Sequence, residues 1–134
     1  MAAFNRSPAH RRGKSAFTTA NGETLDADCS MENEPGFLFD GLVLPDGQAA
    51  VDALASDGHT MEFIKDQYRH CKTLLVLGAS SALLTQAGIE SILPTGEADP
   101  GLIVAAAGDA PADAFIAALG KHRHPERETD PPRV

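Results

Sequence analysis

The chain has 134 residues, enough for one domain whose core buries roughly two-thirds of the surface that the unfolded chain exposes. Hydrophobic residues make up 43% of it and charged residues 22%, which argues against wholesale disorder, a collagen-like repeat and a disulfide scaffold. The formal net charge is −8, and all 19 acidic residues lie beyond residue 14, so we expect the folded part to repel nucleic acid.

The first elements in chain order are an arm and a hairpin. Residues 1–14 are polar, lack periodicity and carry only basic charges, so they are predicted to form a disordered basic arm (Arg6, Arg11, Arg12 and Lys14). Residues 15–19 and 23–29 are short strand-like runs on either side of Asn21-Gly22. Because Asn-Gly between two such runs is a strong turn signal, we predict a β-hairpin here.

The centre of the chain begins with a continuous apolar run over residues 37–44, bounded by Pro45-Asp46-Gly47. This pattern predicts a strand buried on both faces. A helix is predicted from Gln48, because apolar residues follow at helical spacing. After the break at Asp57-Gly58, the residues 59–72 have the periodicity of a second helix.

Two further strand–helix units follow. Residues 73–77 form the clearest strand in the sequence, and residues 78–81 turn it into a helix that ends at Gly88. Residues 102–106 predict a third strand, followed by a helix for which Asp109 is the expected N-cap. Strand–helix alternation indicates an α/β fold in which flanking helices cover a parallel sheet, and the small number of strands predicts that the front of this sheet is missing. We predict that residues 15–124 form this partial domain and that residues 125–134 form a flexible tail.

Two residues are weighed as nucleophiles. Ser80 lies in the turn after residues 73–77, where an α/β fold places its reactive groups, but Gly78 occupies the apex and a serine there also serves as an ordinary N-cap. Cys71 stands between His70 and Lys72, whose charges could lower the pKa of a thiol. A packed, inert thiol fits this position better, since neighbours in sequence point in different directions. We therefore predict no catalytic residue.

Other side chains give weaker signals. His122 and His124 are two candidate metal ligands without a third, and the acidic stretch of residues 26–34 lacks the spacing of a calcium loop, so no metal or cofactor site is predicted. No apolar run reaches the roughly 20 residues of a membrane span. Two cysteines without zinc spacing are typical of reduced proteins, so we predict a cytoplasmic location. The acidic charge and the short apolar runs predict that the chain binds neither nucleic acid nor a membrane.

Several segments resemble one family in the order and spacing of their residues. Residues 38–47 (LFDGLVLPDG), residues 62–72 (EFIKDQYRHCK), residues 99–103 (DPGLI) and residues 21–25 (NGETL) are similar to stretches in the C-terminal domain of large-subunit haem catalases. The resemblance runs from about residue 15 to residue 124. It implies a flavodoxin-like fold related to class I glutamine amidotransferases and deglycases, truncated at its N-terminal side.

The resemblance also implies a role. Relatives of that domain carry a cysteine where this chain has Gly78, so the expected function is that of a non-catalytic accessory domain or fragment of a catalase, whose parent enzyme converts hydrogen peroxide to water and oxygen. Haem belongs to the parent family and no cofactor is expected in this chain. Two alternatives stay open: an amidotransferase-like or deglycase-like enzyme using Cys71 or Ser80, and a small acidic interaction module. Expected partners are catalase subunits or a second copy, joined through an exposed sheet edge.

Overall fold

The computed structural model describes residues 16–134 except Ala20 and Ala107, so the predicted basic arm over residues 1–14 lies outside the described residues. Three parallel strands form the central sheet in the order β3–β4–β5, with β4 in the middle. Their bounds are Gly41–Leu44, Thr73–Leu77 and Leu102–Ala105. The predicted α/β class and the strands over residues 73–77 and 102–106 are thereby confirmed, the last one shorter by a residue.

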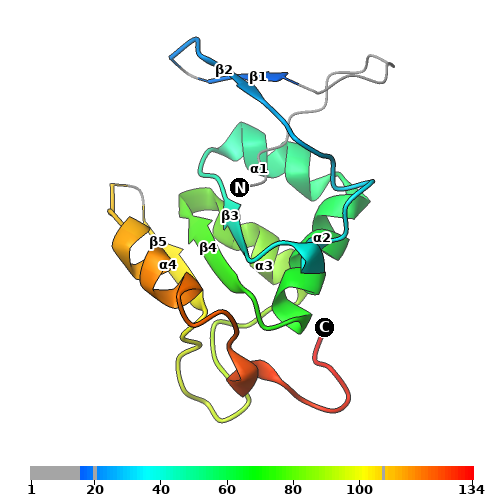
Figure 1. The fold of residues 1–134 in the computed structure, drawn as a ribbon, viewed down its shortest axis with the longest axis vertical. Helices are drawn as coiled ribbons and strands as arrows, with labels where there is room; N and C mark the ends of the chain where they lie inside the picture. Colours follow the sequence, from blue (N-terminus) through cyan, green and yellow to red (C-terminus); the bar gives the residue numbers. More distant parts are fainter. Residues whose placement is uncertain (1–15, 20, 107) are drawn as a thin grey trace.

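The predicted hairpin forms as a separate two-stranded antiparallel sheet. Strand β1 (Ala16–Thr18) pairs with β2 (Thr24–Asp26), and Thr18 faces Thr24 across the Asn21-Gly22 turn. Gly22 adopts a φ of 81°, a left-handed conformation that glycine reaches without a steric penalty. Figure 1 shows this hairpin standing apart from the three-stranded sheet, beyond α1.

Three helices pack on one face of the sheet. They are α1 (Gln48–Ala55), α2 (Gly58–Arg69) and α3 (Ser81–Ala87), and Figure 1 shows them on the side of β3 and β4 away from α4. Alternate strand residues meet them, since Leu42, Leu44, Leu74, Val76 and Leu102 all belong to the buried core. Asp57 accepts a hydrogen bond from the His59 backbone N–H at 2.9 Å and so caps α2, as its place before the apolar stripe indicates.

Helix α4 (Ala112–Leu119) covers the other face of the sheet, where it contacts β4. The predicted cap by Asp109 is wrong: the helix begins after Pro111, and the Asp109 carboxylate instead accepts a hydrogen bond from the Ala106 backbone N–H. Gly88 ends α3 in a left-handed conformation with a φ of 76°, as predicted. Among the described residues, no helix is long and apolar enough to cross a membrane.

The predicted strand over residues 37–44 is wrong in its first half, because only residues 41–44 form β3. Residues Gly36–Leu38 form the 3₁₀ turn η1, and Phe37 and Leu38 are exposed. The physical reason is the contact between η1 and α2, where the buried side-chain amide of Gln67 donates to the carbonyl oxygens of Gly36 and Phe39. Val43 is only partly buried, so β3 is not covered fully on both faces.

The contact between η1 and α2 leads to a first prediction, for Gly36→Ala. A Cβ atom at Gly36 would lie 2.6 Å from the Phe63 carbonyl oxygen, a backbone atom of α2 that cannot rotate away. We expect a loss of about 1–3 kcal/mol in the free energy of unfolding, the usual cost of overpacking. Urea denaturation measures it, and the control is Gly58→Ala, where a Cβ meets no atom within 4 Å and the cost should vanish.

Candidate functional site

The carboxyl ends of β3 and β4 form the place where an α/β sheet usually carries its chemistry. Gly78 follows β4 with a φ of 48°, the strained turn in which a nucleophile would stand. A Cβ atom at Gly78 would collide with the carboxylate of Asp46, which follows β3. The space for a reactive side chain is therefore already filled by a carboxylate of the same chain.

The Asp46 carboxylate also occupies the backbone donors of this turn. Its Oδ1 accepts the Ala79 N–H at 2.9 Å and the Gly47 N–H at 2.7 Å. These two hydrogen bonds, the one from Ala79 foremost, hold the pKa of Asp46 below its ordinary value, so the side chain is an anion at neutral pH. Two converging backbone N–H groups are what an acyl-transfer site needs for a developing oxyanion. Here they already bind an internal anion.

Ser80 lies in the same turn but does not act as the predicted cap. Its side chain is fully buried, and its hydroxyl donates to the Pro45 carbonyl oxygen instead of capping α3. That bond ties the end of β3 to the start of α3. A hydroxyl that is shielded from solvent and committed to a backbone carbonyl is not available as a nucleophile.

Cys71 lies at the opposite, amino end of β4. It follows His70, the C-cap of α2, and has a φ of 58°. Its Sγ is buried, 3.9 Å from the Arg69 carbonyl oxygen and 4.0 Å from Glu128 Oε1. Burial above all, and then the Glu128 carboxylate, raises the pKa of this thiol. The structure thus favours the packed, protonated thiol and does not place Cys71 with Ser80.

A buried polar cluster, which the sequence did not reveal, joins the C-terminal segment to the amino end of the sheet. Arg127, in the 3₁₀ turn η3 (Pro125–Arg127), pairs its Nε with Asp99 Oδ2 at 2.5 Å, and both side chains are almost completely buried. Arg127 Nη1 donates to the Lys72 carbonyl oxygen, and Asp99 Oδ1 accepts the Gly101 N–H. Part of the predicted tail over residues 125–134 is therefore packed against the domain.

His124 is the histidine of this cluster. Its backbone N–H donates to the Cys71 carbonyl oxygen at 2.8 Å, and its Nε2 lies 3.0 Å from Thr73 Oγ1. Burial, followed by the nearby Arg127 guanidinium, lowers the pKa of the imidazole, which favours its neutral form. His122, the other candidate metal ligand, is exposed, and no cluster of three or more metal-ligating side chains exists in the described part of the chain.

His124 gives the second prediction, a pH dependence of stability. The unfolded chain takes up a proton on this histidine below about pH 6.5, whereas the folded chain resists it. The contribution of His124 to stability is therefore constant above that pH and is lost as the pH falls below it. Urea unfolding at pH 7.5, 6.5 and 5.5 measures the slope. We expect His124→Gln to flatten it and the exposed control His122→Gln to leave it unchanged; equal slopes in both variants would contradict this role.

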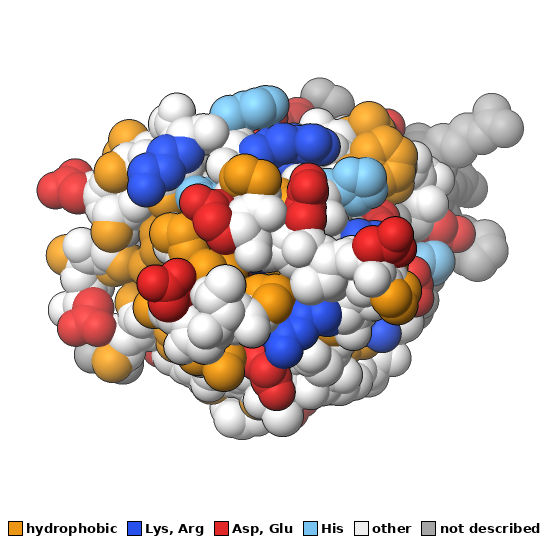
Figure 2. All heavy atoms as spheres, turned by 90° about the horizontal axis from the view of Figure 1, so that it is seen from below, with side chains coloured by type: hydrophobic (Ala, Val, Ile, Leu, Met, Phe, Trp, Pro, Cys, Tyr) orange, Lys and Arg blue, Asp and Glu red, His pale blue; other side chains and the backbone are white. Residues whose placement is uncertain are grey.

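A cavity of about 470 Å³ lies beside the cluster, between α2 and the C-terminal residues. Three arginines line it, but each already faces a carboxylate: Arg69 that of Asp66, Arg127 that of Asp99 and Arg133 that of Glu90. Figure 2 views the molecule from this end and shows basic, acidic and histidine side chains interspersed. The cavity therefore has no surplus of positive charge for an anion, and its charged lining does not suit an apolar porphyrin.

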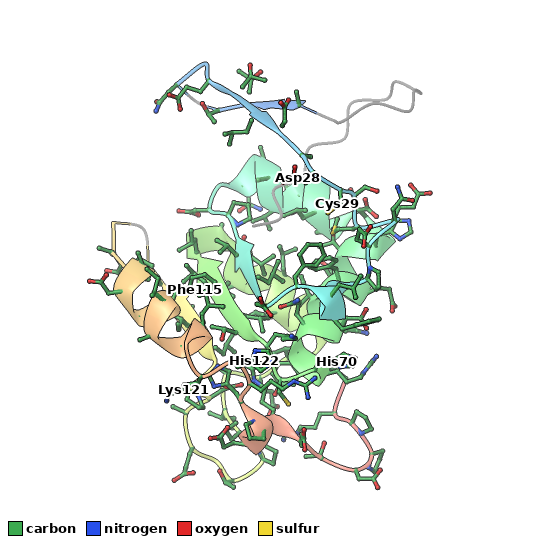
Figure 3. The ribbon with its side chains drawn as sticks, in the orientation of Figure 1. Asp28, Cys29, His70, Phe115, Lys121 and His122 are labelled. Atoms are coloured by element: carbon green, nitrogen blue, oxygen red, sulfur yellow. The ribbon has the colours of Figure 1, made fainter. Side chains whose placement is uncertain are left out.

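The remaining predicted candidates do not converge. Figure 3 shows Asp28 and Cys29 near α1, well above His70 and His122 in the view. Asp28 and Cys29 are exposed. The structure brings Asp46, Gly78 and Ala79 together at the carboxyl ends of the strands, and it brings Asp99, His124 and Arg127 together at the amino ends.

Comparisons with known proteins identify relatives of this chain. A model of the C-terminal domain found in long catalases matches residues 20–129. Catalase HPII of Pseudomonas putida is 36% identical over 108 residues, and catalase HPII of Mycobacterium avium is 34% identical over 118 residues. These matches cover 81% and 82% of the chain, but the chain spans only 14% and 17% of the length of the two relatives.

A solved structure gives the same fold. Drosophila melanogaster DJ-1beta superimposes with a TM-score of 0.57 over 87% of this chain and 72% of its own, at 17% sequence identity. A sequence identity this low supports a similarity of fold alone.

Proposed function

Since this chain belongs to the family of C-terminal domains found in long catalases, we propose that it is a non-catalytic accessory domain of such an enzyme. In this proposal the peroxide chemistry, which yields water and oxygen, takes place on haem in another part of the catalase. The observation that supports this proposal most directly is the turn after β4. There Gly78 has no side chain, and the Asp46 carboxylate accepts the backbone N–H groups that an oxyanion would need.

Three further parts of the proposal concern the surroundings of the domain. We infer that it binds no cofactor of its own, that it associates with catalase subunits, and that it resides in the cytoplasm. The charged lining of the 470 Å³ cavity supports the first part. The family membership supports the second, and the two free thiols, Cys29 and Cys71, agree with the third.

The experiment that tests the proposal is purification from the native source, followed by intact mass, haem absorbance and oxygen evolution from peroxide on one sample. We expect a chain near 14 kDa to lack both a Soret band and oxygen evolution. These residues at the end of a larger polypeptide with a strong Soret band would also agree with an accessory domain. Peroxide turnover by the isolated, haem-free chain would contradict it.

Thiol labelling tests the competing assignment of a cysteine-dependent enzyme. Because Cys71 is buried and its pKa is raised, we expect iodoacetamide at neutral pH to modify the exposed Cys29 first. Mass spectrometry of tryptic peptides gives the two rates, and Cys29→Ser gives the rate of Cys71 alone. Fast labelling of Cys71 in the folded chain would favour a reactive thiol and count against the accessory role.

A further inference from the structure

Helix α4 has the composition of a covered helix, yet most of its surface is exposed. Its sequence, ADAFIAAL, contains one charged residue, and a helix that is apolar on all sides is normally covered on all sides. Here Ala118 is its only buried residue, and Ile116 is 64% exposed. Figure 1 shows α4 at the margin of the molecule. The described part of the chain therefore leaves apolar surface of α4 uncovered.

This uncovered surface points away from the sheet. At about 100° per residue, Ile116 and Gly120 both lie roughly 160° around the helix axis from the buried Ala118. Ala112 lies on the same side of the helix and is also exposed. Phe115, in contrast, is on the sheet side of α4, as Figure 3 shows. We call Ala112, Ile116 and Gly120 the outer stripe; it is distinct from the flank of α4 that meets the sheet.

The glycine of the outer stripe is not required by the conformation of the chain. Gly120 ends α4 with a φ of −60° and a ψ of −20°, ordinary right-handed values at which alanine is the more favourable residue. A Cβ atom at this position would meet only carbonyl oxygens of the same helix, those of Ala117 and Ile116. A glycine without such a local reason suits the close approach of a second backbone.

Opposite charges lie at the two ends of the outer stripe. Asp113 is exposed in the first turn of α4, and Lys121 is exposed directly after Gly120. Within the described residues neither side chain forms an ion pair. The order of charges is reversed in a second copy that runs antiparallel, so each acidic end would meet a basic end. The outer stripe is thus complementary in charge to itself.

We propose that the outer stripe of α4 binds a second copy of this chain, with the two helices antiparallel about a two-fold axis at Ile116. The axis sets Ile116 against Ile116 of the partner subunit. It sets Ala112 against Gly120 of the partner subunit, two small residues that let the helices approach closely. It also brings Asp113 near Lys121 of the partner subunit. This inference goes beyond the proposed function, because the self-association of this domain needs no catalase.

The dimer is expected to be weak. Two helices of eight residues bury less than the roughly 1,200 Å² of a stable interface. The net charge of −8 opposes association at long range, but physiological salt screens this repulsion beyond about 8 Å. Sedimentation equilibrium between about 5 and about 500 μM should therefore show the mean mass rising from 14.1 kDa toward twice that value.

Ile116→Glu tests the apolar contact on the axis. It places two carboxylates against each other, so we expect the dissociation constant to rise at least about tenfold. The matched control is Leu38→Glu on η1, another exposed apolar residue, which is 58% exposed. It changes the net charge equally and should leave the dissociation constant unaltered.

A charge exchange tests the occupant and the antiparallel orientation. Asp113→Lys and Lys121→Asp each set like charges across the interface, and each should weaken self-association about tenfold. An equimolar mixture of the two variants should form a heterodimer, because every basic end then meets an acidic end. The helix dipole also favours acid before base along α4, but it acts within one chain and cannot restore association on mixing. Amide spectra show whether each variant is folded; if one is not, Ile116→Glu and the parent chain decide.

Three outcomes would overturn the proposal. A mass of 14.1 kDa at every concentration would mean that the outer stripe binds no second copy. A dimer that survives Ile116→Glu unchanged would place the interface elsewhere. A mixture of the two charge variants that associates no better than each variant alone would mean that Asp113 and Lys121 do not meet. None of these results bears on the accessory role in a catalase.

Discussion

Replacing Arg127 by methionine is expected to lower the free energy of unfolding by about 3–5 kcal/mol, because it leaves the buried Asp99 carboxylate without its partner. The pair sits where η3 meets the amino end of β4, and the same guanidinium also donates to the Lys72 carbonyl oxygen and stacks on the Tyr68 ring at 4.9 Å. Urea denaturation at pH 7.5 measures the loss. Because domains of ordinary stability unfold at a cost of about 5–15 kcal/mol, this loss removes a large share of the total.

The matched control is Arg133→Met, the same substitution in an ion pair that solvent reaches. Arg133 Nη2 lies 3.6 Å from Glu90 Oε2, and both side chains are substantially exposed. Exposed pairs contribute at most about 1 kcal/mol, so this variant should unfold almost like the parent chain. A second test is Arg127→Met combined with Asp99→Leu, which removes both charges and should be more stable than Arg127→Met alone. Equal losses in the Arg127 and Arg133 variants would contradict the buried pair.

Truncating Leu74 to alanine is expected to cost about 2–5 kcal/mol, since the residue is fully buried at the centre of the sheet. Strand β4 has a neighbour on both sides, and Leu74 pairs in register with Leu42 of β3 and Leu102 of β5. The missing atoms would leave a cavity between the sheet and its three covering helices, which cannot close without moving a strand. Chemical denaturation, with the m-value compared, measures the loss.

The control for Leu74→Ala is Ile116→Ala on α4. Ile116 is 64% exposed, so its truncation removes little buried surface and should change the free energy of unfolding by less than about 0.5 kcal/mol. A large loss at Ile116 together with a small one at Leu74 would mean that the outer face of α4, and not the face of β4, is the one that is packed in solution.

The sequence alone indicated one of the two features of the turn after β4. Gly78 stands at the apex of a strand-to-helix turn, and the absence of a side chain there already argued against a nucleophile. The role of Asp46 was not visible, because the residue lies 33 positions before Ala79 and reads as part of an ordinary Pro-Asp-Gly turn. Only the parallel pairing of β3 with β4 brings that carboxylate onto the Gly78-Ala79 turn.

The cluster at the amino end of the sheet could not be predicted, for a similar reason. Asp99 and Arg127 are 28 residues apart, and Thr73 and His124 are 51 apart. Arg127 stands in a proline-rich, polar segment whose composition is typical of a tail, and no periodicity marks its side chain as buried. One local sign existed: Asp99-Pro100-Gly101 is a turn sequence in which the aspartate accepts the glycine N–H.

The sequence by itself determined the α/β class, the hairpin at Asn21-Gly22, the strand Thr73–Leu77 and the likeness to the catalase domain, because local periodicity, turn residues and motif order are written along the chain. Only the tertiary structure determined which side chains occupy the ends of the strands. It placed Asp46 over the turn after β4 and set Arg127 and His124 at the amino end of the sheet. Each of these depends on contacts between residues far apart in sequence, where no local pattern constrains the partner.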